Sequence, residues 1–202
     1  MAEKLVRDAL ILWATIDPIG TMALFAAITR NLDASARRRT AFKAIVYAIV
    51  ILIACIVIGQ VLLTAMGISL LSFQIAGGVI LFIFGLQMIF GTGVASDPPE
   101  REPGHDIAVF PLAVPSIATP GAILAAILLT DNHIYTIPAQ IATTAVMIVV
   151  LAITLALMLG ATLVLRVIGN NGASILVRVM GLLLAALSVE FVMDALMLSS
   201  TE

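Results

Sequence analysis

Two short motifs place a polar side chain beside a helix-breaking proline and glycine, each within a long apolar run. The first motif is Asp17-Pro18-Ile19-Gly20, and 102 residues later comes Thr119-Pro120-Gly121-Ala122. Proline removes a backbone donor and clashes with the preceding turn, so a helix that contains it loses hydrogen bonds there. In hydrocarbon the freed backbone groups must bind protein, water or a ligand. Interrupted helices at matching positions of two halves are typical of a transporter's central binding site.

The carboxylate of the first motif is the strongest candidate for chemistry. Asp17 follows about twelve residues of its apolar run, roughly 18 Å along a helix, which places it near the membrane midplane. An ionisable residue at that depth costs at least ~2.5 kcal/mol on insertion scales and marks a functional site by default. Two roles stay open: a ligand for a substrate ammonium or a proton, and a cap for the N–H groups after the break. The predicted substrate-binding residues are Asp17, Pro18, Gly20, Thr21, Ser116, Thr119, Pro120 and Gly121.

Glu190 is the other carboxylate that the pattern places well inside a span, and Asp17 and Glu190 are the candidates for ion coupling. The alternative for Glu190 is a hydrogen bond to a neighbouring helix. Asp194 follows four residues later on the same helix face, nearer the end of the span. No His, Cys and carboxylate residues have the spacing of a metal site, so we expect neither a metal nor a cofactor. Motifs of zinc peptidases, serine hydrolases and P-loop enzymes are absent, so we do not expect an enzyme.

The composition requires a membrane protein. Of the 202 residues, 62% are hydrophobic and 11% are charged, and the mean hydropathy is +1.20. At about 20 residues per helical span, six crossings with their loops account for the length. The lipid bilayer is therefore an expected partner, whereas nucleic acid is not, because no basic cluster carries interleaved aromatic residues. The predicted spans are Leu5–Thr29, Ala41–Met66, Ile68–Phe90, Ile107–Thr130, Thr136–Ile168 and Ile175–Leu198.

The two halves of the chain resemble each other. Besides the matched breaks, Gly78 corresponds to Gly181 and Gln87 to Glu190 at an offset of 103 residues. Residues 1–90 and 107–202 form the halves, joined by a polar, proline-rich linker at 91–106. Three spans per half is an odd number, so the second half must be inserted upside down. The prediction is a single all-α membrane domain over 1–202, a 3+3 inverted-topology repeat with broken first and fourth helices.

The distribution of positive charge predicts the orientation. The first, third and fifth connections collect eight Lys and Arg residues, against Lys4 and Arg7 on the opposite side. Cytoplasmic loops carry the excess of positive charge, so both termini should face the outer, periplasmic side.

Further motifs complete a family pattern. They are Phe73 with Ile75-Ala76-Gly77-Gly78, Pro111-Leu112-Ala113-Val114-Pro115 ahead of Pro120-Gly121-Ala122-Ile123, and Arg178-Val179-Met180-Gly181-Leu182. With the Asp17 motif, they make the chain resemble the MarC family of six-span inner-membrane proteins over nearly its whole length. The resemblance implies the LysE-like transporter superfamily and a class described as neutral amino-acid transporters. Asp17 stands where some members carry Asn.

Three functions follow from these observations. The first is secondary transport of small neutral amino acids such as glycine or alanine, coupled to protons or to sodium. The second is export of another small metabolite or of an ion. The third is a scaffold subunit that transports nothing, which predicts a dry, closed core around Pro18 and Pro120. Homo-oligomerisation is left open by the sequence.

Overall fold

The computed structural model describes residues 2–91 and 106–199, and all regular structure in these ranges is helical. The predicted linker at 91–106 and the last three residues therefore lie almost wholly outside the described residues. The elements are α1 (Ala2–Ile16), α2 (Pro18–Ile28), α3 (Ala34–Ala65), α4 (Leu70–Phe90), η1 (Ala108–Ile117), α5 (Pro120–Leu129) and α6 (Ile137–Ser199).

The predicted membrane spans are present with bounds that differ by a few residues. In the described ranges, five helical stretches are long and apolar enough to cross a bilayer: Ala2–Ile28, Ala34–Ala65, Leu70–Phe90, Ile137–Gly169 and Asn171–Met197. The pair of η1 and α5 makes a sixth span if it is counted as one, bent by 56° at its break. The prediction of an all-helical polytopic membrane protein is thus confirmed.

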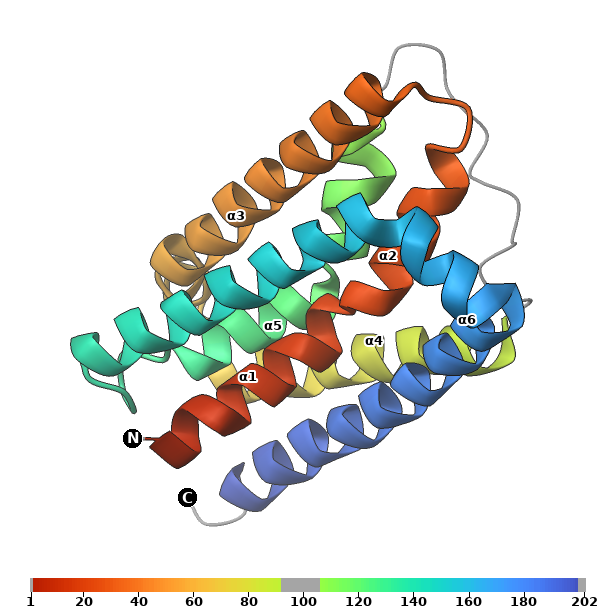
Figure 1. Ribbon diagram of the computed structural model, residues 1–202. Coiled ribbons are helices and arrows are strands. Elements are labelled where there is room, and N and C mark those ends of the chain that lie inside the picture. The colour runs from red at the N-terminus through yellow and green to blue at the C-terminus, as the bar shows by residue number, and fades with distance from the viewer. Residues whose placement is uncertain (1, 92–105, 200–202) are drawn as a thin grey trace.

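The last two spans are joined without the expected loop between Ile168 and Ile175. The helix α6 continues through this region, and its one non-helical residue is Gly169, with φ 67° and ψ 169°. Glycine reaches this conformation without a steric penalty, so a single residue can turn the chain sharply. Figure 1 shows the resulting corner between the two halves of α6.

The first span and α5 form the interior of the bundle. The most apolar part of Ala2–Ile28 is 61% buried, against 22% for α3 and for α4, so the latter present most of their surface outward. Large side chains of the interior, such as Phe25 and Leu124, are fully buried. Figure 1 shows α1 between the two halves of α6, with α5 behind it. The exposed apolar residues of the outer helices match a lipid environment, in which apolar surface needs no cover.

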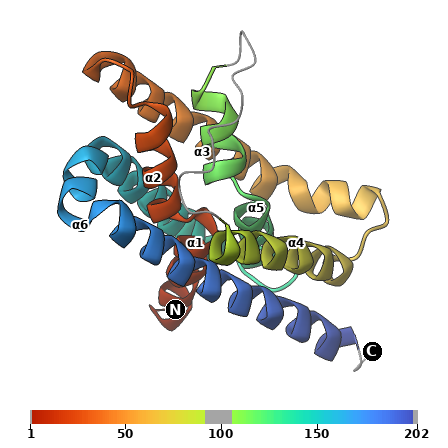
Figure 2. The same cartoon turned by 90° about the vertical axis from the view of Figure 1, so that its right-hand side faces the viewer.

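The small residues of the third span allow a close helix crossing between α4 and the second half of α6 (Figure 2). A Cβ added at Gly85 of α4 would lie 2.9 Å from the carbonyl oxygen of Gly181 in α6. A Cβ at Gly181 would lie 2.8 Å from the carbonyl oxygen of Gly85. The two backbones therefore touch directly, and only glycine fits on both sides.

Candidate functional site

The first break is a single left-handed residue. Asp17 has φ 49° and ψ 69° and separates α1 from α2. Aspartate tolerates this conformation better than most residues because its short polar side chain can bond locally. Its Oδ1 accepts a hydrogen bond from the Gly20 N–H at 3.0 Å, which caps α2, and Pro18 occupies the first turn. Oδ2 of the same carboxylate accepts no hydrogen bond from any described residue.

Glycine at position 20 is required by the cap itself. A Cβ at Gly20 would lie 2.0 Å from Asp17 Oδ2 and 2.8 Å from Asp17 Cγ. To admit a methyl group at position 20, either the Asp17 carboxylate or the backbone of α2 would have to shift. Position 121 is also tight, because a Cβ there would lie 2.0 Å from Leu81 Cδ1. In that case the obstacle is the flexible end of a leucine side chain, which can move.

The second break has the same construction with a hydroxyl in place of the carboxylate. Thr119 precedes α5, and its Oγ1 accepts a hydrogen bond from the Ala122 N–H at 2.8 Å. Pro120 occupies the first turn, where a missing N–H leaves no bond unmade. Ahead of the break, η1 is a wide and irregular helical segment with extended backbone at Phe110 and Val114. Each of these two residues is followed by a cis proline.

Hydroxyl groups tie the two breaks to each other. Thr119 Oγ1 donates a hydrogen bond of 2.7 Å to the carbonyl oxygen of Thr15, in the last turn of α1. In the opposite direction, Thr21 Oγ1 in α2 donates to the carbonyl oxygen of Ser116 at 3.0 Å, and the two hydroxyls are 3.0 Å apart. Each bond satisfies a carbonyl that the break has freed from its helix. The two breaks therefore lie side by side, although about a hundred residues separate them in the chain.

Thr119 should contribute strongly to stability because it serves both breaks. We expect Thr119→Val to lower the free energy of unfolding by about 2–3 kcal/mol, through loss of a cap and of a partner for a buried carbonyl. For a chain of this length, the unfolding temperature in detergent then falls by about 5–10 °C. Thr119→Ser keeps the hydroxyl and serves as the control. Equal unfolding temperatures for the Val and Ser variants would contradict this role of the hydroxyl.

The residues at the two breaks and the carboxylates of α6 differ in burial. Thr15, Asp17, Thr21 and Thr119 are buried, with at most 5% exposure. Gly20 and Ser116 are half-buried, Pro18 and Gly121 are buried, and Pro120 is exposed. Glu190 and Asp194 are exposed on the second half of α6, and no hydrogen bond joins them to either break among the described residues. The structure does not bring Glu190 to Asp17, so its coupling role has no support from the packing.

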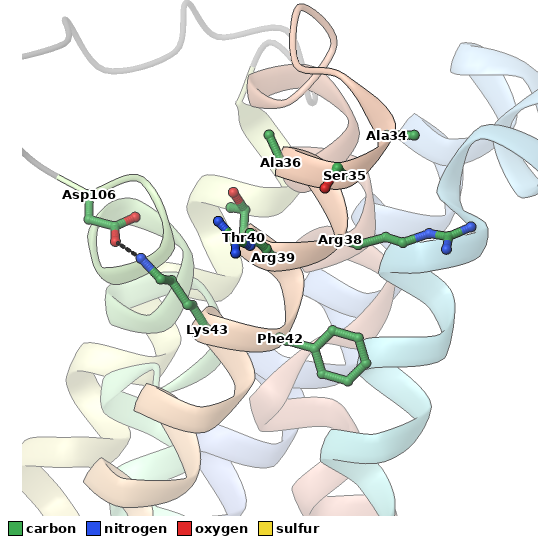
Figure 3. A pocket seen from close by; sticks show the side chains of 9 residues that line it. All are labelled: Ala34, Ser35, Ala36, Arg38, Arg39, Thr40, Phe42, Lys43 and Asp106. Atoms are coloured by element: carbon green, nitrogen blue, oxygen red, sulfur yellow. Dashed lines mark hydrogen bonds and ion pairs between the residues drawn. The ribbon is translucent and has the colours of Figure 1, made fainter.

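Two cavities lined by described residues lie away from the breaks. One of about 990 Å³ is lined by the start of α3, including Arg38, Arg39 and Phe42. Figure 3 shows Lys43 in its wall, bonded to Asp106 at 3.0 Å. The Ala108 N–H, and then Lys43, hold the pKa of Asp106 below its usual range. Another cavity of about 390 Å³ lies at the opposite end of α3, beside Asp131 and His133.

Two buried carboxylates, Asp8 and Asp131, were missed by the sequence reasoning. Asp8 is fully buried although it lies only two turns into α1, and it pairs with Lys4. The spacing of four residues between Lys4 and Asp8 was a usable signal, because such residues face each other on a helix. The other partner of Asp8, Thr143, is far away in the chain and gives no local signal. No group of three or more His, Cys, Asp and Glu residues converges within the described ranges.

Comparison with known proteins assigns the chain to a family. The family model described as MarC family integral membrane protein matches residues 2–199. The chain belongs to the MarC family. This confirms the resemblance drawn from the motifs, and with the apolar helices it shows an integral membrane protein.

Curated MarC relatives match nearly end to end. An "UPF0056 inner membrane protein MarC" of Salmonella arizonae is 31% identical over 195 residues, covering 90% of this chain and 88% of the relative. An "UPF0056 membrane protein" of Archaeoglobus fulgidus is 33% identical over 190 residues, with coverage of 92% and 88%. One from Buchnera aphidicola is 27% identical over 194 residues and 96% of both chains. No solved structure matches the chain.

Proposed function

We propose that this MarC family member is a secondary transporter of small neutral amino acids such as glycine or alanine, located in the inner membrane. The observation that carries the proposal is the meeting of two helix breaks in the interior of the bundle, tied through Thr119 and Thr21. Paired half-helices at the centre of a membrane protein provide helix N-termini and freed carbonyls to a substrate. The names of the relatives support an inner-membrane location and leave the substrate open.

The groups at the breaks suit a small zwitterion. The N-termini of α2 and α5 carry partial positive charge, which favours a substrate carboxylate. Asp17 Oδ2, free of protein hydrogen bonds in the described chain, can accept a bond from the substrate ammonium. The backbone is crowded at Gly20 and Gly121, where even a methyl group would collide with a neighbour. Little room remains for a substrate side chain, which favours glycine and alanine over larger amino acids.

We further propose that the chain is a 3+3 inverted repeat. Support comes from a pair of contacts between α4 and the second half of α6. A Cβ at Gly78 would lie 3.1 Å from the Ser188 carbonyl oxygen, and one at Gly181 would lie 2.8 Å from that of Gly85. An offset of 103 residues converts Gly78 into Gly181 and Gly85 into Ser188. A twofold exchange of the halves therefore turns the first contact into the second, as an inverted repeat requires.

The packing around the breaks is also compatible with the alternative function, a scaffold that transports nothing. Asp17, Pro18 and Thr119 are buried, and this closed arrangement matches either a scaffold or the occluded state of a transporter. Pro120 is exposed, so the second break is not fully enclosed. Transport would be driven by either a proton gradient or a sodium gradient.

Uptake by reconstituted protein tests the proposal. Purified protein in liposomes should accumulate labelled glycine and alanine above the level of protein-free liposomes, with either a proton or a sodium gradient imposed. Unlabelled alanine should compete, whereas lysine should not, because its long cationic side chain finds no space at the breaks. Absence of uptake under every gradient would favour the scaffold, and uptake of an unrelated metabolite would favour the second function.

The orientation can be tested by cysteine labelling. After Cys55 is replaced by Ser, a cysteine at Arg38 should resist an impermeant thiol reagent applied to intact cells. A cysteine at His133, at the other end of the bundle, should react. Both side chains are exposed, so their reactivity reports sidedness and not burial. The reverse pattern would overturn the orientation that the positive charges predict.

A further inference from the structure

Three elements converge on the ammonium group of Lys4. Lys4 Nζ forms an ion pair with Asp8 on α1 and donates to Thr143 Oγ1 on α6 at 2.8 Å. It also lies 3.4 Å from the carbonyl oxygen of Leu129, the last residue of α5. The ring of Tyr135 covers it, with 4.1 Å between Nζ and the ring centroid. The ammonium is thus surrounded by a carboxylate, a hydroxyl, a carbonyl and an aromatic face.

Asp8, the acidic partner of Lys4, is fully buried, unlike the carboxylate of an ordinary surface ion pair. The Asp8 side chain has no exposed surface, and Thr143 Oγ1 donates to its Oδ2 at 2.6 Å. Its other oxygen, Oδ1, is buried and has no hydrogen-bond partner in the described chain. A buried oxygen with unused lone pairs is costly, and native proteins usually satisfy such groups. Here it leaves the site with capacity for a further cation contact.

The oxygen set has the chemistry of an alkali-cation site. Carboxylate, hydroxyl and carbonyl oxygens are ligands of hard cations, and the C-terminal end of a helix adds partial negative charge. In broken-helix transporters, freed carbonyls and helix C-termini are the groups that hold sodium. The site contains one carboxylate, so a single positive charge balances it. The Lys4 ammonium supplies that charge from within the chain.

We propose that Asp8, Thr143 and the Leu129 carbonyl form a monovalent-cation site, and that the Lys4 ammonium is its built-in occupant. The site joins α1, the end of α5 and the start of α6, so its occupant holds together the helices that carry both breaks. Asp8 lies nine residues before Asp17, about 14 Å along α1. The inference goes beyond the proposed transport function, because the cation site can exist without transport.

Removal of the ammonium should create a sodium-binding protein. Lys4→Met keeps the length of the aliphatic stem, removes the ammonium and leaves Asp8 without its counter-charge. We expect the unfolding temperature of this variant in detergent to rise saturably when sodium chloride replaces choline chloride at constant ionic strength. At a sodium concentration ten times the dissociation constant, the rise should be about 3–6 °C. The wild-type protein should show no such difference.

Two controls separate the site from general salt effects. Lys43→Met breaks the exposed ion pair with Asp106 at the other end of the bundle, and it should show no preference for sodium over choline. The double variant Lys4→Met with Asp8→Asn removes the carboxylate as well, and the sodium effect should disappear. Lys4→Gln is a second single variant, because its neutral amide can still donate to Asp8. It should also be stabilised by sodium.

Each outcome of these measurements either supports or contradicts the cation site. Sodium-specific stabilisation of the Lys4 variants that is lost with Asp8→Asn establishes the site, even if no uptake of amino acids is ever measured. Stabilisation of neither Lys4 variant by sodium, lithium or potassium over choline overturns it. Failure of both variants to fold in sodium-rich buffer also overturns it, since an inorganic cation should replace the ammonium. Failure of uptake by the wild-type protein bears on the proposed transport alone.

Discussion

Replacement of Asp17 by Asn should leave the protein folded and reduce its affinity for glycine or alanine tenfold to a hundredfold. Asn accepts the Gly20 N–H through its side-chain oxygen and tolerates the left-handed backbone at position 17, so the cap survives. The charge at Oδ2 is lost, and with it a charge-assisted bond to the substrate ammonium. Such a bond contributes about 1.5–3 kcal/mol, which corresponds to the stated change in affinity. Uptake by proteoliposomes at graded substrate concentrations measures it.

The Ala variant separates the two roles of Asp17. Asp17→Ala removes the cap and places a side chain without local hydrogen bonds at φ 49°. We expect it to lose about 2–3 kcal/mol of stability in addition to the loss of uptake. Uptake by the Asn variant at the wild-type level would show that Asp17 acts as a cap alone. Proton coupling through Asp17 would then be excluded as well, and sodium or uncoupled transport would remain.

Gly20→Ala should be among the most damaging single-methyl changes in the chain. The new Cβ would overlap the Asp17 carboxylate, so either the cap breaks or α2 shifts away from the break. Loss of the cap together with overpacking should lower the free energy of unfolding by about 2–4 kcal/mol. The unfolding temperature in detergent should fall by roughly 5–15 °C. Uptake should fall as well, because the same carboxylate is the proposed ammonium ligand.

The chain supplies matched controls for this substitution. Gly160 lies within α6, and a Cβ added there would meet no atom within 4 Å, so Gly160→Ala should be neutral or slightly stabilising. Gly121→Ala should be intermediate, since the Leu81 side chain that it meets can change rotamer. An order other than Gly20, Gly121, Gly160 in decreasing damage would contradict the assigned geometry of the first break.

The sequence by itself determined the class of the protein and the positions of its breaks. In a chain with 11% charged residues, apolar runs of about 20 residues are typical of membrane-spanning helices. Proline acts on its own helix through a missing donor, so the breaks at Pro18 and Pro120 could be located without knowledge of the fold. The ordered motifs were specific enough to indicate the MarC family, which the family model confirms.

Only the tertiary structure decided which distant groups meet. The bonds from Thr119 to Thr15 and from Thr21 to Ser116 join residues about a hundred positions apart, and no local pattern encodes such a pairing. Depth within a predicted span does not tell which side of the helix a residue occupies. The criterion therefore favoured Glu190 and missed Asp8, yet packing exposes the first and buries the second. The reason is physical: the depth of a residue along a helix follows from the chain, whereas the neighbour that its side chain faces depends on how the helices pack.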